Sequence, residues 1–284
     1  MPTTSHYFTS LKTPPVSHST AEHKSLDPGS NNSPQAGILI INADDWGRDQ
    51  DTTDRILDCV LRGSVSSTSA MVFMEDSERA AALACEKGVD IGLHLNFTTC
   101  FSSPTISGRL SEHHERVARF LRQRRLSQVV YHPGLASSFE YLVAAQLEEF
   151  HRTYGADPRR VDGHHHMHLC ANVLFAGLLP AGTIARRNFS FRPGEKSGLN
   201  RLYRGTIDRI LAKRHRLTDF FFSLLPCEPA GRLDLIFELA RQSVIEVETH
   251  PINPNEYRFL MEGEIFRRAN VPIATSYAMS NPNR

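Results

Sequence analysis

The sequence predicts an α/β protein whose parallel strands form a closed or nearly closed β/α barrel. Three observations support this class. Apolar strand-like runs alternate with amphipathic helical stretches at intervals of about 25 residues, which is typical of βαβ units. One run, residues 38–41, is entirely apolar, as in strands buried on both faces. Acidic residues or histidines follow several predicted strands, and the carboxyl ends of barrel strands converge on one mouth.

The domain organisation follows from a change in composition near residue 37. Residues 1–36 mix Ser, Thr, Pro and His with isolated charges, and they contain no apolar segment of the kind found in signal peptides. We expect this segment to be a disordered polar extension without an assigned role. Residues 37–284 are then expected to form a single β/α-barrel domain.

Composition excludes several classes of function. The net charge of +1 gives no reason to expect nucleic-acid or membrane binding, and no run approaches the ~20 apolar residues of a transmembrane helix. The five cysteines show no CxxC spacing and are typical of reduced thiols in a cytoplasmic protein. The sequence does not define the oligomeric state, and a homodimer is compatible with it.

The first predicted strand leads directly into two carboxylates, Asp44 and Asp45. In a straight strand their side chains would point to opposite faces, so both can reach one site only where the chain turns. Gly47 supplies such a turn. The alternative interpretation is an acidic pair that starts a turn and caps the next helix.

The next elements continue the alternation. Residues 50–62 show the apolar spacing of an amphipathic helix, which Gly63 ends. Residues 65–73 are predicted to form a strand, and residues 77–87 an alanine-rich helix that ends at Gly88.

Residues 89–96 alternate between two faces of a predicted strand. One face is apolar, and the other holds Asp90, Gly92, His94 and Asn96. If the apolar face packs on the outer helices, His94 points into the barrel and Gly92 leaves room beside it. A histidine that is hydrogen-bonded in the core is the alternative interpretation.

The middle of the chain is less informative. Residues 98–108 are predicted to be a loop, residues 111–125 a polar helix with a solvated basic face, and residues 137–154 a longer amphipathic helix.

The most unusual stretch is residues 160–169, which hold four histidines in five positions. In extended geometry Asp162, His164, His166 and His168 share one face. A flexible metal-scavenging tract is the alternative. The flanking apolar residues favour a site embedded in the fold.

Residues 185–216 are basic and contain a predicted helix over residues 198–213. One interpretation is a solvated basic side of that helix. A more specific hypothesis is that Arg187 or Arg192 contacts a phosphate or carboxylate on the substrate, because arginine binds such groups with two parallel hydrogen bonds.

A last predicted strand, residues 243–249, ends in His250, and Pro251 then directs the chain away from the strand. Residues 256–268 are predicted to form a closing helix.

Candidate catalytic groups thus come from separate strand ends: Asp44, Asp45, His94, His164 and His250. A carboxylate with two imidazoles makes a divalent site with open positions, which suits Zn, Mn, Fe, Co or Ni, with Mg less expected of histidine. Such an ion would lower the pKa of bound water and polarise a carbonyl group. A second carboxylate is then free to act as a base, and a separate histidine can protonate the leaving group.

At this point the chain resembles a known family, the YdjC-like carbohydrate deacetylases, also called the ChbG/HpnK family. The resemblance is carried by five segments in the family's order: residues 42–47, 63–71, 91–95, 161–168 and 249–251. It implies an irregular β/α barrel of the polysaccharide-deacetylase-like type. It also implies hydrolysis of N-acetyl groups on amino sugars or glycoconjugates by attack of metal-bound water.

The resemblance further implies residue roles. Asp45, His94 and His164 would bind one divalent ion, Mg²⁺ or Zn²⁺, while Asp44 would be the base and His250 the acid. Residues expected around this set, or against substrate, are Asp162, His166, His168, Trp46, Arg187 and Arg192. Alternation alone does not choose between His164 and His166 as the ligand.

The chain departs from the family pattern in two places, of which the second, the basic segment, leaves the substrate open. Trp46 stands where the family usually has Phe, and the basic segment 188–194 is not typical of chitooligosaccharide-active members. We therefore predict a carbohydrate N-deacetylase whose N-acetylated substrate is not defined by the sequence. The alternatives are a metal-dependent phosphoesterase on a similar barrel and an inactive metal- or sugar-binding module.

Overall fold

The computed structural model describes residues 37–277, apart from residues 125, 192–193, 227–230 and 270. Within this part of the chain the strands form one sheet in which every neighbouring pair is parallel. The sheet order is β5-β4-β3-β2-β1-β7-β6. The strands are β1 (Ile38–Trp46), β2 (Ser67–Ala70), β3 (Ile91–Leu95), β4 (Arg160–Gly163), β5 (Ile184–Ala185), β6 (Phe220–Ser223) and β7 (Val244–Thr249).

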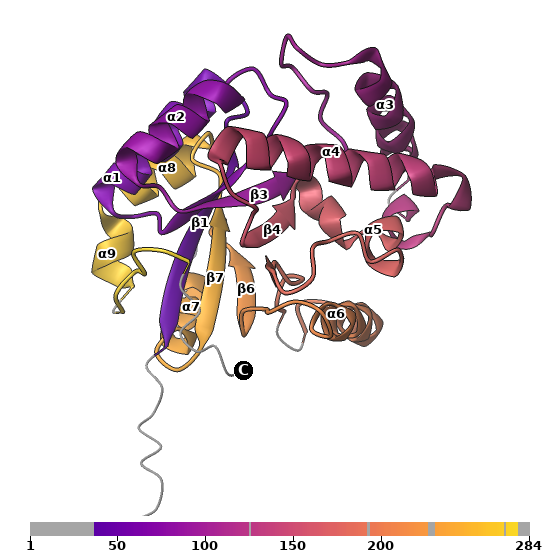
Figure 1. The fold of residues 1–284 in the computed structure, drawn as a ribbon. Coiled ribbons are helices and arrows are strands. Elements are labelled where there is room, and N and C mark those ends of the chain that lie inside the picture. Colours follow the sequence, from indigo (N-terminus) through magenta and orange to yellow (C-terminus); the bar gives the residue numbers. More distant parts are fainter. Residues whose placement is uncertain (1–36, 125, 192–193, 227–230, 270, 278–284) are drawn as a thin grey trace, which may run out of the picture. The chain divides into compact units, whose positions relative to one another are not determined.

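Helices connect the strands and cover the outside of the sheet (Figure 1). The α-helices are α1 (Gln50–Arg62), α2 (Ser77–Lys87), α3 (Gly108–Gln123), α4 (Ala136–Tyr154), α5 (Ala171–Phe175), α6 (Gly198–Leu211), α7 (Gly231–Leu239), α8 (Pro254–Met261) and α9 (Glu264–Arg268). Short 3₁₀ turns are η1 (Ser127–Val129), η2 (Pro133–Leu135) and η3 (His164–Leu169). Helix α1 packs on β1 and α8, whereas α4 packs on β3, α2 and α3.

The two faces of the sheet differ in chemistry. On β1, Leu39, Ile41 and Ala43 belong to the apolar core shared with the helices. The alternate positions, which include Asn42 and Asp44, face the other way and are buried as well. All residues of β1 from Leu39 onward are buried, as the apolar run predicted.

The sheet curls so that its two edges approach each other. Beyond β5, the backbone N–H of Ser190 donates to the carbonyl of Phe221 in β6 at 2.8 Å. In return, the backbone N–H of Phe221 donates to the Ser190 side chain at 3.1 Å. Direct pairing between β5 and β6 is absent from the sheet order of the described residues, and the chain that follows β5 closes the gap instead. This arrangement confirms the predicted irregular β/α barrel.

Most predicted elements are confirmed to within a few residues, and α1 illustrates why. Its N-terminus is capped by Asp49, whose carboxylate accepts from the backbone N–H of Thr52 at 2.8 Å, and Gly63 ends it at φ 77°. The predicted closing helix over residues 256–268 is instead two helices, α8 and α9. Gly263, in the left-handed region at φ 75°, breaks it because that conformation cannot continue a helix.

The extended geometry predicted for residues 164–168 is wrong. After β4 ends at Gly163, the histidines form η3, in which His165 and His166 take left-handed conformations at φ 53° and 58°. These two values reverse the chain direction, so the period-two alternation of side chains stops at Gly163.

None of the described helices is both long enough and apolar enough to cross a membrane. The predicted N-terminal extension, residues 1–36, lies outside the described residues.

Candidate active site

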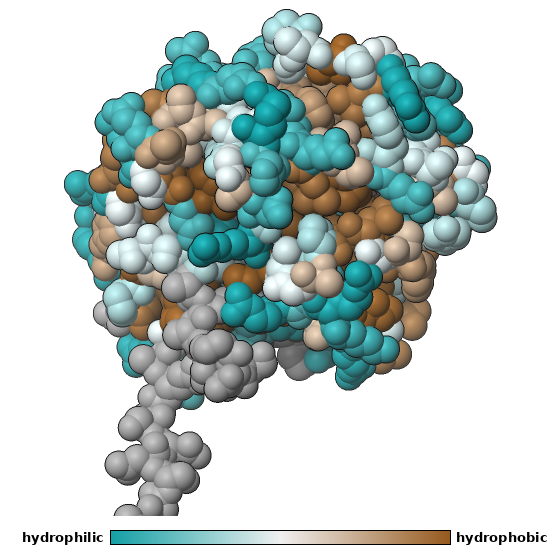
Figure 2. Space-filling view, in the orientation of Figure 1, coloured by the Kyte–Doolittle hydropathy of each residue, from teal (hydrophilic) through white to brown (hydrophobic). Residues whose placement is uncertain are grey.

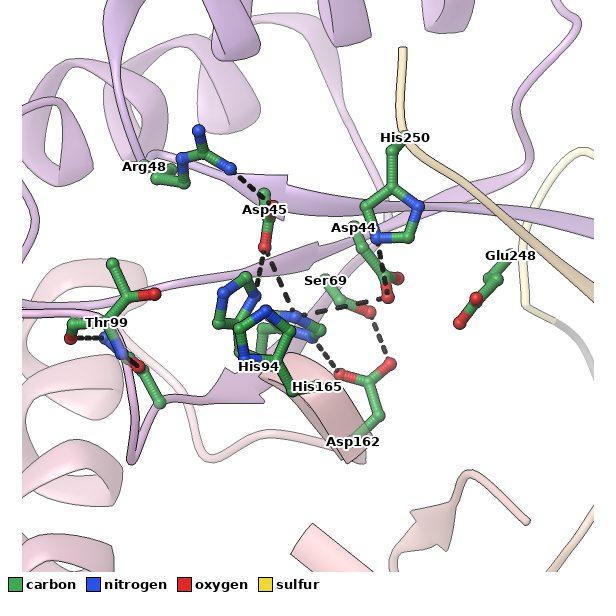
Figure 3. A network of polar contacts seen from close by, with 12 residues as sticks. Asp44, Asp45, Arg48, Ser69, His94, Thr99, Asp162, His165, Glu248 and His250 are labelled. Atoms are coloured by element: carbon green, nitrogen blue, oxygen red, sulfur yellow. Dashed lines mark hydrogen bonds and ion pairs between the residues drawn. The ribbon is translucent and has the colours of Figure 1, made fainter. Parts of the chain in front are cut away.

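Polar side chains on the interior face of the sheet cluster near the carboxyl ends of its strands (Figure 3). Asp44 and Asp45 stand near the end of β1, His94 near the end of β3 and Asp162 near the end of β4, while His250 follows β7. Because neighbouring parallel strands end at the same edge, these side chains come together although they are up to about two hundred residues apart in sequence.

The end of β1 is shaped so that two adjacent carboxylates serve one site. The pairing of β1 with β2 shifts register between Ala43 and Trp46. Asp45 takes a left-handed conformation at φ 73°, and Gly47 another at φ 83°. The bulge turns the Asp45 side chain toward the same side as Asp44, which confirms the turn that the sequence required.

Asp45, His94 and His164 form a buried cluster whose ligand atoms all lie within 4.8 Å of one another. The Oδ1 atom of Asp45 lies 2.9 Å from Nδ1 of His164 and 3.4 Å from Nε2 of His94. The other Asp45 oxygen accepts from Arg48 at 3.0 Å. Burial alone would raise the pKa of Asp45, but the hydrogen bond to His164 and the nearby imidazole of His94 outweigh burial and hold this pKa well below its usual range.

His94 is oriented as a metal-binding histidine would be. Its Nδ1 atom lies 2.7 Å from Oδ1 of Asp162, so a proton on Nδ1 is donated to that carboxylate and Nε2 faces Asp45 at 3.4 Å. Nε2 is buried and has no hydrogen-bond partner among the described residues. An unpaired imidazole nitrogen beside a carboxylate and a second imidazole fits a divalent cation.

Electrostatics also favour a cation at this point. Burial alone would lower the pKa of His94, but the carboxylates of Asp44 and Asp162 outweigh it and raise this pKa to about 10. The negative field that stabilises a proton on His94 would attract a metal ion in its place.

Arg186, directly after β5, holds the neighbouring carboxylates in place. It is fully buried, and its guanidinium group donates to both oxygens of Asp44 at 2.6 and 2.7 Å. The same group lies 2.9 Å from Asp162 and 2.7 Å from Glu246. Burial would lower the pKa of Arg186, but the surrounding carboxylates raise it well above its ordinary value, so the group stays charged.

Asp44 is therefore an ionised carboxylate in a fixed orientation. Burial would raise its pKa, yet the charge of Arg186 lowers it below the ordinary value. Asn42 donates a further hydrogen bond to Oδ1 at 2.9 Å. The Oδ2 atom lies 4.0 Å from Nε2 of His94 and 3.9 Å from Nε2 of His250.

A second cluster, Asp44, His94 and Asp162, also has ligand atoms within 4.8 Å. It is a poorer cation site, because Arg186 already occupies the space beside Asp44 and Asp162 with positive charge. The donor set and the unpaired Nε2 atom both favour the cluster that contains His164.

His250 lies on the open side of the site, with 36% of its side chain exposed. Its backbone N–H donates to Glu256 at 2.8 Å, and the hydroxyl of Thr249 donates to the same carboxylate oxygen at 2.6 Å. Glu256 thereby fixes the turn that carries His250.

The 3₁₀ turn η3 sends its histidines to different partners. His164 reaches Asp45, and His165 lies 3.0 Å from the hydroxyl of Thr98. The Nε2 atom of His166 lies 3.6 Å from Glu248, and Nε2 of His168 donates to the carbonyl of Arg186 at 3.0 Å. Of the two histidines that alternation left open, the structure places His164 with Asp45 and His94.

Several of the groups described above line a cavity of about 490 Å³. Its walls include Asp44, Asp45, His164, Glu248 and His250. A substrate in this cavity would meet the carboxylates and the imidazoles together.

A second cavity, of about 740 Å³, shares His165 and His166 with the first. Its other walls include Phe189, Leu199 and Tyr203. Figure 2 shows hydrophobic residues reaching the surface around α5 and beside α6, and Leu199 of α6 is 78% exposed.

Two residues predicted to border the site, Trp46 and Arg187, are not brought to the cavity that contains Asp44. Trp46 is fully buried in the apolar core. Arg187 is held by Asp208 at 2.8 Å and by the backbone carbonyls of Thr218 and Asp219. Arg192 lies outside the described residues.

Four buried residues of the network were not predicted as site residues from the sequence: Arg186, Glu246, Glu248 and Glu256. Two of them carried a usable signal. In β7, Glu246 and Glu248 alternate with Ile245 and Val247, and acidic residues at every second position of a buried strand indicate a polar interior. Arg186 could not be distinguished within a segment rich in arginine.

Comparison with known proteins supplies a family for this arrangement. The profile of the family described as YdjC-like protein matches residues 38–258. The chitooligosaccharide deacetylases of Yersinia pestis (strain Pestoides F) and Yersinia pseudotuberculosis (serotype O:1b, strain IP 31758) are each 30% identical to the chain over 138 residues. These alignments cover 48% of this chain and 52% of each relative, so the chain spans about half the length of the curated relatives it matches.

Among solved structures, a proposed cellobiose-phosphate cleavage protein from Enterococcus faecalis V583 superposes with a TM-score of 0.60. It is 19% identical, and the superposition covers 85% of this chain and 98% of the other. At this level of identity the likeness concerns the fold, which is the same irregular barrel.

Proposed function

The chain belongs to the YdjC-like protein family, and on this premise we propose that it is a metal-dependent carbohydrate N-deacetylase. The observation that carries the proposal is the cluster of Asp45, His94 and His164 beside Asp44 and His250 at one cavity. Hydrolysis of an acetamide needs an activated water, a base and an acid, and these five side chains can supply all three.

Asp45, His94 and His164 would hold one divalent ion, and this donor set suits Zn²⁺, with Mg²⁺ as the other candidate. When bound, the ion would lower the pKa of a coordinated water and polarise the acetamide carbonyl. Asp162 would keep the His94 ring in the orientation that leaves Nε2 available.

Asp44 would take the proton from the attacking water. The lowered pKa of Asp44 keeps it ionised, and Arg186 with Asn42 fixes its orientation. His250, with its Nε2 atom 3.9 Å from Asp44, would then give a proton to the nitrogen of the departing amino sugar. Its partly exposed position suits a group that must recover a proton from solvent after each cycle.

The relatives named chitooligosaccharide deacetylases suggest an N-acetylglucosamine saccharide as substrate. The cavity of about 490 Å³ would receive the sugar whose acetyl group is removed. Further units of an oligosaccharide would extend into the adjoining cavity, where aromatic faces such as Phe189 and Tyr203 can pack on sugar rings.

Acetate release tests this proposal directly. Purified protein is assayed with N-acetylated mono- and oligosaccharides in the presence of added Zn²⁺ or Mg²⁺, with a chelator control. We expect acetate from at least one saccharide and none after chelation. Release of phosphate from a phosphorylated saccharide without any acetate would replace the deacetylase by a phosphoesterase.

A further inference from the structure

Glu248 is a buried carboxyl group for which the deacetylase chemistry has no stated use. It lies on the interior face of β7, two residues before His250, and is 5% exposed. Its side chain lines the cavity that also contains Asp44 and His250. In Figure 3 its carboxyl group points toward the part of the network that holds Asp44 and Asp162.

Glu246, two residues earlier on the same face, provides a direct comparison. Both of its oxygens are engaged, one by Arg186 at 2.7 Å and the other by the hydroxyl of Tyr277 at 2.7 Å. The Oε2 atom of Glu248 has no hydrogen-bond partner among the described residues. Its nearest positively charged or imidazole groups are Arg186 at 3.5 Å and His166 at 3.6 Å, both beyond ordinary hydrogen-bond length.

A buried carboxyl oxygen without a hydrogen-bond partner is costly, so a structure that keeps one beside a cavity points to a ligand. Burial and the negative charge of Asp44 raise the pKa of Glu248 well above its ordinary value, which favours a neutral carboxyl group. A neutral carboxyl group both donates and accepts hydrogen bonds, and a hydroxyl group matches it in both respects.

We propose that Glu248 is a substrate-contact residue that hydrogen-bonds a hydroxyl group of the sugar carrying the acetamide. The assignment rests on the proposed deacetylase function, because that function places the sugar in the cavity beside Asp44 and His250. A single residue separates Glu248 on β7 from His250 directly after the strand, so both can contact the same ring.

The test compares Glu248→Ala, Glu248→Gln and wild type on an N-acetylglucosamine disaccharide and on its monodeoxy analogues, each lacking one hydroxyl on the acetylated ring. For the parent disaccharide we expect Glu248→Ala to lower kcat/KM by roughly 10- to 100-fold, mostly through KM. For the analogue that lacks the hydroxyl group bound by Glu248, wild type and Glu248→Ala should have the same kcat/KM, since the hydrogen bond is already absent. Glu248→Gln, which keeps shape and hydrogen-bonding groups, should lose less.

Glu246→Gln is the matched control, because Glu246 shares the strand face but does not line the cavity. It should affect all analogues alike. If Glu248→Ala also lowers kcat/KM by the same factor for every analogue, Glu248 acts only on structure and the assignment is overturned.

Calorimetric titration of the zinc-loaded proteins with the same saccharides separates this inference from the function beneath it. If binding depends on Glu248 and on one hydroxyl group of the sugar, but the wild type releases no acetate, then the proposed deacetylase function is wrong and the Glu248 contact is retained. If the wild type releases acetate but the effect of Glu248→Ala is the same for every analogue, then the deacetylase function is retained and the Glu248 contact is overturned. Absence of both binding and acetate would overturn both. Should Glu248→Ala fail to fold, Glu248→Leu, which keeps a similar volume and removes the hydrogen-bonding groups, decides by the same comparison.

Discussion

Asp44 and Asp45 are neighbours in sequence but have different surroundings. Asp44 is held by the guanidinium group of Arg186, which makes two hydrogen bonds to it, whereas Asp45 faces two imidazoles. A carboxylate already paired with a guanidinium is a poor cation ligand but a well-oriented base. A carboxylate between two imidazoles is a natural cation ligand. The local environment therefore supports the proposed division of the two roles within one acidic pair.

The substitution Asp44→Asn tests this division. We expect kcat to fall by roughly 10²- to 10⁴-fold, because the base is removed, while bound metal stays near the wild-type amount. Asp45→Asn should lose the metal as well as the activity. Metal content is measured by atomic emission on the same preparations that are assayed for acetate. Loss of metal from the Asp44 variant would reassign Asp44 as a ligand.

Arg186 shows how one buried residue organises several others. It contacts carboxylates from three different strands, those of Asp44, Asp162 and Glu246. Its backbone carbonyl also accepts from His168, so the same residue holds η3 in place. A buried cation with this many partners stabilises the network only as long as all of them remain.

At the scale of elements, η3 explains how a histidine-rich segment becomes a site. His165 and His166 lie in the left-handed region, which is unfavourable for residues other than glycine. The resulting reversal directs His164 to Asp45 and His168 to the backbone of Arg186. Strain in this turn is compensated by the hydrogen bonds that its side chains make.

The left-handed conformation gives a testable prediction for His165. Both His165→Ala and His165→Gly lose the contact with Thr98, so their difference reports on the backbone. We expect the glycine variant to have a free energy of unfolding about 1 kcal/mol larger than that of the alanine variant. Denaturant unfolding measures both.

The exposed helical residue Arg119 in α3 is the control for that comparison. At this position the alanine variant should have a free energy of unfolding about 1 kcal/mol larger than that of the glycine variant, since an α-helix favours alanine. The same order at both positions would show that residue 165 is not left-handed in solution.

Helix α3 carries a buried histidine that makes stability depend on pH. His114 is 2% exposed and packs against Phe101, and burial, with a contribution from Arg122, lowers its pKa to about 4. The unfolded chain binds the proton near pH 6.5, so between pH 6.5 and 4 it holds more protons than the folded chain. The contribution of His114 to the free energy of unfolding is therefore fully present above pH 6.5 and is lost as the pH falls to 4.

The loss amounts to about 3 kcal/mol of unfolding free energy, obtained from the pKa difference. Substitution His114→Phe removes the titrating group and should flatten the pH profile of stability in this range. Urea unfolding of both proteins from pH 4 to 7 provides the measurement. Parallel profiles for the variant and the wild type would contradict the assignment.

For the described part of the molecule as a whole, the sheet order explains why the site lies where it does. Strand β1 is paired on both sides, by β2 and β7, and its end carries Asp44 and Asp45. His94, Asp162 and Arg186 arrive from β3, β4 and the end of β5, and Glu248 from β7. Parallel strands with helical connections make this convergence a consequence of topology.

Much of this arrangement follows from local patterns in the sequence. The alternation around His94 correctly places it inward with Gly92 beside it. A side chain at Gly92 would meet the Arg160 guanidinium at 2.7 Å. The approach of Asp44 and Asp45 to one site required a turn at Gly47, and the left-handed Gly47 is present, together with a register shift that was not predicted.

The remainder depends on contacts between distant residues. The reversal at His165 cannot be read from a run of histidines. Histidine enters the left-handed region more often than most residues, but the run does not specify which of its members do so. Arg186 is one of many arginines in its segment, and only its burial among three carboxylates distinguishes it. Burial of this kind is a property of the assembled sheet.

The most direct test of the central claim is to titrate metal-free protein with Zn²⁺ while measuring both bound metal and acetate release from an N-acetylglucosamine oligosaccharide. The account predicts that acetate release rises in proportion to bound metal and reaches its maximum at one ion per chain, held by Asp45, His94 and His164. Full acetate release from metal-free protein, or none at one bound ion per chain, would contradict it.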